Sequence, residues 1–365
     1  MKEVLLIASG TLGAKQVGQQ FQPYVRIRDK FCVEHVLDAA IQATSIGTIY
    51  IWGDKARLES MLAGTISRAV QLGIEVRIVQ EKSNFVDSFL FTYMTFLCHR
   101  FGCPDEGVLM ASEMGQPHWE LLQAFGQNQT IAQMSINLLL SDTPLIRPDE
   151  IDCLIQNKNP QADFVLGRTV KQAMDAALSC VPEPFQYSRA IKNYYNFVFK
   201  GNSFDLIVNS FMAGRPLLVP RYVWNLAGHL FNNRTIIEGG RFNLKKIKSN
   251  AVFFKTLFSQ VHLHEAEQTH LFPGSAAKKY YQRLKAFSFL VRAYFIIVKN
   301  KSSNNKFRDL SILEERVQTL AHCRITCQIS NCIGPALDID TEYEIEYIER
   351  FFALLQGDNQ PVIYS

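Results

Sequence analysis

Short apolar runs alternate with helical repeats along the first 170 residues of this chain. The apolar runs, each about as long as a buried strand, are residues 3–8, 48–52, 75–79, 107–111 and 136–140. The helical repeats, in which apolar side chains recur every three or four positions, are residues 31–43, 55–72 and 85–101. Strands that alternate with helices form parallel βαβ units, so the pattern predicts an α/β fold with a mostly parallel sheet flanked by helices.

The second half of the chain is less regular. Further strands are predicted at residues 162–167, 194–199 and 323–328, and helices at residues 211–250, 276–299, 312–321 and after Asp340. A polar linker at residues 300–306 separates the last of these elements from the helices before it. We therefore predict that residues 1–200 and 311–365 form one α/β domain, and that residues 201–310 are a largely helical insertion.

The composition is that of an ordinary globular protein. The chain has 365 residues, of which 47% are hydrophobic and 20% charged, and a net charge of +4. The first half has no basic block interleaved with aromatic residues, so nucleic acid is not an expected partner. The spacing of the eight cysteines fits no zinc ribbon, and the apolar start is too short for a signal peptide. We expect reduced thiols and a cytoplasmic location.

Residues 278–299 leave one interaction open. Basic side chains flank an aromatic-rich apolar helix that is too short to span a bilayer and is interrupted by Arg292. Such a helix either packs against the protein core or lies on an anionic membrane surface. Peripheral membrane contact is therefore a possible role of this segment.

A carboxylate follows the most apolar of the predicted strands. Asp142 comes two residues after the end of the run at residues 136–140, and Pro144 follows in the turn that breaks the strand. Ligands of open α/β sheets gather beyond the carboxyl ends of the strands, where an aspartate can hold Mg²⁺ against a phosphate. The alternative is that Asp142 only turns the chain or caps the next helix.

A second acidic segment lies near the C-terminus. Asp338 and Asp340 project to the same side of an extended chain, Thr341 is a helix N-cap, and Glu344 completes a capping box. Either this is an ordinary helix start with surplus acid, or it supplies a second carboxylate for the cation at Asp142.

Several segments together resemble the nucleotidyltransferase superfamily with a GT-A-like fold. This group includes molybdenum-cofactor guanylyltransferase-like proteins, cytidylyltransferases and sugar-phosphate nucleotidyltransferases. Residues 6–10 are similar to its first strand and Gly-rich loop, residues 140–145 to its Gly-Asp-x-Pro-Leu strand end, and residues 338–341 to its Asp-Ile-Asp-Thr element. Residues 27–37 are similar to the segment that opens its first helix. The resemblance is weak or absent over residues 200–310.

The resemblance implies a reaction and a set of residues. The reaction is the Mg²⁺-dependent transfer of a nucleoside monophosphate from a nucleoside triphosphate to a phosphorylated small molecule, a sugar phosphate or phospho-alcohol, with release of pyrophosphate. Asp142 and Asp340 would bind the metal, with Asp338 in reserve. The nucleotide would lie on Ala8, Ser9, Gly10, Thr11 and Gly13, and the cations that act on the phosphates would be Lys15 and Lys30. Gly201 and Asn202 would line the acceptor pocket, with a hairpin turn as the equal alternative for these two residues.

The chain departs from the family pattern at two positions where the family has a cationic side chain. Lys15 stands where the family has arginine, and Gln22 stands where it has lysine. A lost charge-assisted contact to the triphosphate costs about 1.5–3 kcal/mol. Arg26 or Lys30 could supply the missing charge. Otherwise the chain is a degraded relative that binds a nucleotide, a protein partner or a membrane without catalysis. A nicotinamide-dependent oxidoreductase is disfavoured because no Gly-x-Gly-x-x-Gly follows the first strand.

Overall fold

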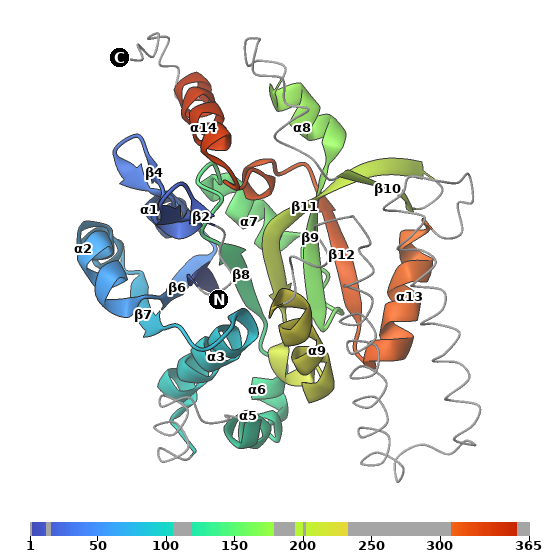
Figure 1. Cartoon of the computed structure of the whole chain (residues 1–365). Coiled ribbons are helices and arrows are strands. Elements are labelled where there is room, and N and C mark those ends of the chain that lie inside the picture. Colours follow the sequence, from blue (N-terminus) through green and yellow to red (C-terminus); the bar gives the residue numbers. More distant parts are fainter. Residues whose placement is uncertain are drawn as a thin grey trace, which may run out of the picture.

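Seven of the predicted strands and one strand that the sequence did not predict form a mixed sheet of eight strands in the described residues (Figure 1). The computed structural model describes residues 2–11, 16–104, 119–178, 194–199, 202–232 and 308–355. In space the order is β12-β9-β11-β8-β1-β6-β7, and β10 pairs with β11. The strands are β1 (Glu3–Ser9), β6 (Ile46–Gly53), β7 (Glu75–Gln80), β8 (Ile136–Leu140), β9 (Phe164–Val170), β10 (Tyr194–Phe199), β11 (Asn202–Gly214) and β12 (Ile325–Ser330). Only β11 runs antiparallel to its neighbours β8, β9 and β10, so the predicted α/β fold with a mostly parallel sheet is confirmed.

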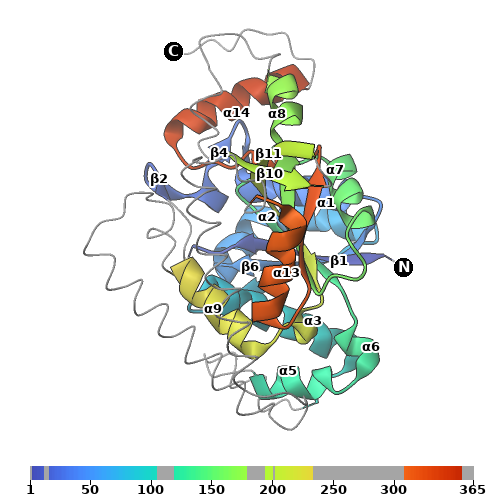
Figure 2. The same cartoon turned by 90° about the vertical axis from the view of Figure 1, so that its right-hand side faces the viewer.

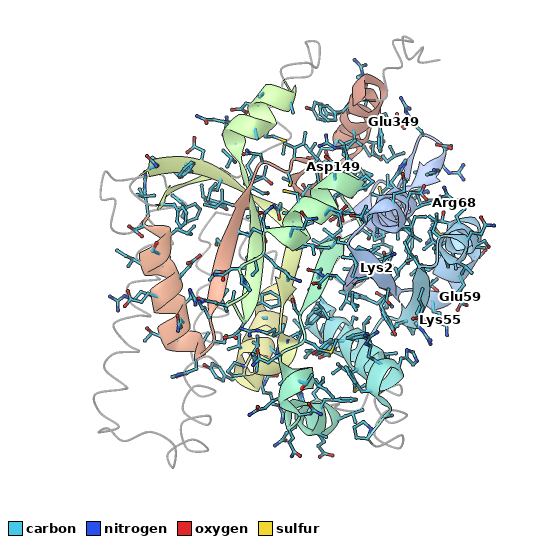
Figure 3. All side chains as sticks on the ribbon, turned by 180° about the vertical axis from the view of Figure 1, so that it is seen from behind. Lys2, Lys55, Glu59, Arg68, Asp149 and Glu349 are labelled. Carbon is cyan, nitrogen blue, oxygen red and sulfur yellow. The ribbon has the colours of Figure 1, made fainter. Side chains whose placement is uncertain are left out.

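Helices cover both faces of the sheet (Figure 2). One face, which we call the α1 face, carries α1 (Cys32–Gln42), α2 (Lys55–Gln71) and α7 (Pro148–Gln156). It is turned toward the reader in Figure 3, in which the molecule of Figure 1 is seen from behind. The other, the α3 face, carries α3 (Phe85–Phe101), α5 (Trp119–Gly126), α6 (Gln129–Ala132) and α9 (Arg221–Asn232), with α13 (Leu310–Ala321) packed beside β12. Side chains of a strand alternate between faces, so in β1 Leu5 and Ile7 pack on the α1 face and Leu6 and Ala8 on the α3 face.

A third group of elements closes over the carboxyl ends of the parallel strands, at the top of Figure 1. It consists of β2 (Gln16–Val17), β3 (Gln20–Phe21), η1 (Gln22–Tyr24), β4 (Arg26–Ile27), β5 (Lys30–Phe31), α8 (Lys171–Leu178), η5 (Gly334–Ala336) and α14 (Glu342–Leu355). A separate apolar cluster joins β2, β4, α8, η5 and α14, and it includes Cys32, Leu145 and Ile339. Three segments that are distant in the sequence therefore share one packed layer at this edge of the sheet.

The helix predicted over residues 211–250 is wrong at its start. Residues 202–214 form β11, which pairs with β8, β9 and β10, and α9 begins at Arg221. Pairing with strands elsewhere in the chain outweighs the local helical pattern. The sheet thus extends beyond residue 200, where we place the start of the insertion.

Several predictions lie outside the described residues. These are the strand at residues 107–111, the helix at residues 278–299 with its membrane contact, and most of the insertion. In the part of the chain that the structure describes, no helix is long and apolar enough to cross a membrane. The seven cysteines described there are all free thiols.

Gly167 in β9 is a position where the fold leaves no space for a side chain. A Cβ there would overlap Asn209 Oδ1 and would lie 2.8 Å from the carbonyl oxygen of Phe211. Asn209 is itself fixed, since it donates to Thr169 Oγ1 at 3.1 Å and accepts from the Phe211 N–H at 3.1 Å. We expect Gly167→Ala to lower the free energy of unfolding by about 3 kcal/mol, measured by urea denaturation.

The matched control is Gly64, an exposed residue inside α2 with no atom near its missing Cβ. Gly64→Ala should raise the free energy of unfolding by about 0.5–1 kcal/mol, because alanine favours the helix. Equal effects of the two substitutions would contradict the packing at Gly167.

Candidate functional site

Hydrogen bonds join the three motif segments at the carboxyl edge of the sheet. The Ala8 carbonyl oxygen accepts from the Ser141 N–H at 3.0 Å and from Ser141 Oγ at 2.6 Å, which ties the end of β8 to the end of β1. The Asp142 carbonyl oxygen accepts from the Ile339 N–H at 3.1 Å. The backbone therefore holds Asp142 beside residues 338–340, the two acidic segments that the sequence separates most widely.

Four carboxylates act on one another in this region. Desolvation, followed by the negative charges of Asp142, Asp340 and Glu344, raises the pKa of Asp338 to about 8. The charges of the neighbouring carboxylates act on Asp338 even though its side chain contacts solvent. Cys32 lies close enough that burial and the Asp142 charge raise the pKa of its thiol, which stays protonated.

Helix α14 begins directly after Asp340 and Thr341. Glu344 is buried and reaches back to the residue before the predicted N-cap Thr341, where its Oε2 accepts from the Asp340 N–H at 2.6 Å. The Glu344 N–H donates to the Thr341 carbonyl oxygen at 3.1 Å. The capping interaction therefore also fixes the backbone of Asp340.

Gln22, which stands where the family has lysine, contacts Asp340. Its side chain is 4% exposed, and Nε2 donates to the Ile339 carbonyl oxygen at 2.6 Å and to Asp340 Oδ1 at 2.8 Å. A neutral amide here orients the Asp340 carboxylate without neutralising it. Gln22 is therefore part of the carboxylate cluster.

The turn after β1 faces a carboxylate that sequence reasoning missed. Glu81, just beyond β7, accepts from the Thr11 N–H at 2.7 Å and from Thr11 Oγ1 at 2.7 Å. A Cβ on Gly10 would lie 2.6 Å from Glu81 Oε2, so this approach requires glycine. Of the predicted nucleotide residues, Ser9 is fully buried and Ala8 nearly so, whereas Gly10 and Thr11 are partly exposed. The signal that could have found Glu81 is its place at a strand end, as for Asp142.

Glu150 is a second missed residue, and it holds the turn that leads to Asp338. It is buried, and its Oε1 accepts from the Ile333 N–H at 2.7 Å and the Gly334 N–H at 3.1 Å. Its Oε2 accepts from the Arg147 N–H at 3.1 Å, and desolvation raises its pKa. In the sequence it resembled an ordinary acid in the first turn of a helix.

Two predicted residues lie away from the carboxylates. Lys30 Nζ forms an ion pair with Asp38 Oδ2 at 2.7 Å on α1. Asn202 is the first residue of β11 and pairs with Phe199, which is the register of a hairpin turn. At 3.4 Å per residue, about 27 Å of strand separates Asn202 from Ser210, whose hydroxyl contacts Thr143 Oγ1 at 3.3 Å next to Asp142. Gly13, Lys15 and Gly201 lie outside the described residues.

The docking of α14 depends on a half-buried histidine of α1. The His35 ring lies 4.7 Å from the Phe352 ring on α14, and its Nε2 donates to the Ile27 carbonyl oxygen at 3.1 Å. Burial is the main cause that lowers the pKa of His35 below its ordinary value near 6.5. The folded chain therefore disfavours protonation of His35. The stability that neutral His35 contributes is fully present above the pKa that this residue has in the unfolded chain, and it is lost as the pH falls below that value.

We expect the wild-type chain to lose more thermal stability between pH 7 and pH 5 than His35→Gln does. The glutamine amide can donate the same hydrogen bond without titrating. Melting curves of both chains at the two pH values measure this difference. Parallel losses in the two chains would show that His35 does not contribute to acid destabilisation.

The donor set of the cluster suits a hard cation. Among the described residues, no set of three or more His, Cys, Asp and Glu side chains is arranged as a ready metal site. Mg²⁺ keeps several waters and takes only one or two carboxylates, so it does not require such a set. Asp142 with Asp340 supplies oxygen ligands of the right kind, and the repulsion at Asp338 is what a divalent cation would relieve.

Comparisons with known proteins give structural neighbours only. Neither a family model nor a curated protein sequence matches the chain. A hypothetical transferase from Thermus thermophilus aligns over 94% of this chain and 100% of its own, with a TM-score of 0.49 and 11% identity. CMP:2-keto-3-deoxy-manno-octonic acid synthetase in complex with CTP aligns over 66% of this chain and 87% of its own, with a TM-score of 0.37 and 14% identity. 4-Diphosphocytidyl-2C-methyl-D-erythritol synthase aligns over 60% of this chain and 76% of its own, with a TM-score of 0.32 and 10% identity.

Proposed function

We propose that this chain is a Mg²⁺-dependent nucleotidyltransferase. It would transfer a nucleoside monophosphate from a nucleoside triphosphate to a phosphorylated small molecule, a sugar phosphate or phospho-alcohol, and release pyrophosphate. The observation that carries the proposal is the meeting of Asp142 with Asp338 and Asp340 next to the end of β1, where Ser141 bonds to Ala8. Ligands of an open α/β sheet bind at this edge.

In the proposed reaction each residue has a separate role, which follows from its position in the site. An oxygen of the acceptor phosphate forms a bond to the α-phosphorus, the bond from that phosphorus to the bridging oxygen breaks, and pyrophosphate leaves with the electron pair. When bound, Mg²⁺ neutralises the negative charge that gathers on the phosphoryl oxygens. Asp142 and Asp340 would hold the cation, and Gln22 and Glu344 keep Asp340 in place. Backbone N–H groups of the glycine turn, with Lys15, would bind the triphosphate.

A binding function without catalysis is the second candidate. It is favoured by the surroundings of two residues. Lys30 is paired with Asp38, and Gln22 is a neutral amide that contacts Asp340, so neither offers a positive charge to a triphosphate. In that case the chain would bind a nucleotide, or a protein or membrane partner through residues 201–310, and Lys15 and Arg26 would not sustain turnover.

One experiment separates these candidates. The full chain is mixed with each of the four nucleoside triphosphates with and without Mg²⁺, and its melting temperature is measured. Pyrophosphate release is then followed with a panel of sugar phosphates and phospho-alcohols. The transferase proposal requires Mg²⁺-dependent stabilisation by at least one nucleotide together with pyrophosphate release. Stabilisation without release supports the binding function, and no stabilisation by any nucleotide rejects both.

A further inference from the structure

Arg168 is a cation on the open part of the α3 face. It lies on β9, and within the described residues its guanidinium makes one hydrogen bond, from Nη1 to the neighbouring Gly167 carbonyl oxygen at 2.7 Å. No carboxylate of the described residues pairs with it. Other cations on or near these strands do have partners: Arg147 with Asp149, Lys171 with Asp175, and Arg215 with Asp163. Within the described residues, most of the five donors of Arg168 therefore have no protein acceptor.

The strand register places Arg168 level with the end of β8. Leu138 of β8 and Leu166 of β9 both pair with Met212 of β11. Arg168 is two residues beyond Leu166, and Leu140 is two residues beyond Leu138, so the two lie at the same height just below Asp142. Two strand spacings separate them, about 10 Å, which is the size of a small phosphorylated molecule.

The same register fixes the face on which Arg168 lies. Paired residues share a face, and Arg168 pairs with Val208 of β11 and Ile329 of β12. Phe164, four residues earlier on β9, packs in the α3-face core, so Arg168 lies on that face. The charge of Arg168 also counteracts the rise in the pKa of Cys327, which belongs to the same face.

The surface beside Arg168 is uncovered. Val208 pairs with Arg168, lies one residue beyond the last pair of β11 with β10, and is 52% exposed. An apolar side chain next to an available guanidinium offers contact with a carbon skeleton and bidentate hydrogen bonds to an oxyanion. The carboxylates around Asp142 repel an anionic acceptor, so a cation on this side is needed to hold one.

We propose that Arg168, with Val208 beside it, forms the acceptor half of the site and binds an oxyanion, phosphate or carboxylate, of the acceptor. This inference rests on the proposed function and names the residue that selects its second substrate. It also moves the acceptor from the hairpin at Asn202 to the strand level of the carboxylates. The nucleotide and the acceptor would then lie on opposite sides of Asp142 along one edge of the sheet.

Binding to the full chain tests this inference by calorimetry. The probes are glycerol 3-phosphate, glucose 1-phosphate and glucuronate, each compared with its neutral counterpart, glycerol or glucose. We expect the wild-type chain to bind at least one anion ten or more times more tightly than the neutral molecule. Arg168→Gln should abolish that preference, and Arg168→Lys should retain part of it. Whether a phosphate or a carboxylate is preferred identifies the oxyanion.

Arg316→Gln on α13 is the matched control, since Arg316 is paired with Glu315 at 3.8 Å, and it should keep the full preference. An unchanged preference in Arg168→Gln overturns the inference, and so does the absence of any anion preference in the wild-type chain. Nucleotide-dependent melting is measured on the same samples. Its retention in Arg168→Gln shows an intact fold, whereas its absence in the wild-type chain rejects the proposed function itself.

Discussion

Asp142→Asn is expected to reduce the rate of pyrophosphate release by about a hundred- to a thousandfold, the cost of losing one group that stabilises transition-state charge. Asparagine has the same shape and keeps the backbone contact between the Asp142 carbonyl oxygen and the Ile339 N–H. It removes only the charge, which a hard cation requires of its ligand. The Mg²⁺-dependent part of nucleotide stabilisation should disappear with the activity.

Asp340→Asn should have an effect of similar size, and the double variant should be little worse than either single variant. Residues that hold one ion act as a unit, so their losses do not add. Two independent losses that multiply in the double variant would indicate that the two carboxylates serve different steps. Rates at saturating nucleotide and a series of Mg²⁺ concentrations provide the measurement.

Asp149→Asn is the matched control for both substitutions. Asp149 is an exposed residue of α7 on the α1 face, labelled in Figure 3, and it pairs with Arg147 at 3.0 Å. Removing its charge should leave turnover and the Mg²⁺ requirement unchanged. A loss of activity in Asp149→Asn equal to that in Asp142→Asn would attribute the effect to overall charge.

The sequence predicts the elements of the fold well wherever local patterns decide them. The helix over residues 85–101 is found with its predicted bounds, because Asn84 caps it and Gly102 ends it. The strand before Asp142 ends at Leu140 as predicted, since an apolar run followed by a polar turn and Pro144 leaves little choice. Such features depend on neighbours in the chain.

β11 was missed because long-range pairing decides it. Its middle contains the buried polar residues Asn209 and Ser210, opposite an interruption in the register with β9, so neither alternation nor a continuous apolar run is visible. The strand exists because β8 and β9 lie on either side of it. A local pattern contains no information about those partners.

The candidate site likewise contains features that the sequence predicted and features that it could not predict. Resemblance to a known family brought Asp142 and Asp340 into one prediction, and the structure places their segments in contact. The roles of Gln22, Glu81 and Glu150 could not be predicted, because each depends on a hydrogen-bond partner far away in the sequence. The identity of a residue indicates its chemistry, whereas its partner decides its role.

The second prediction with a large expected effect concerns Gln22→Lys. The family pattern and the structure predict opposite changes in turnover for this substitution. In the family pattern a lysine here contacts the triphosphate, and regaining such a contact would raise turnover. In this structure the side chain is directed at Asp340 Oδ1, 2.8 Å from Gln22 Nε2, in a buried position. An ammonium group introduced there would meet the carboxylate before it met a phosphate.

We therefore expect Gln22→Lys to weaken Mg²⁺ binding by about tenfold or more, equivalent to about 1.4 kcal/mol, and to lower turnover at limiting Mg²⁺. The new ion pair neutralises Asp340, so the divalent cation must compete with it, and excess Mg²⁺ should restore part of the rate. Gln71→Lys, an exposed position at the end of α2, adds the same charge elsewhere and should change neither quantity. Faster turnover in Gln22→Lys at every Mg²⁺ concentration would instead mean that Gln22 marks a lost phosphate contact and does not serve to orient Asp340.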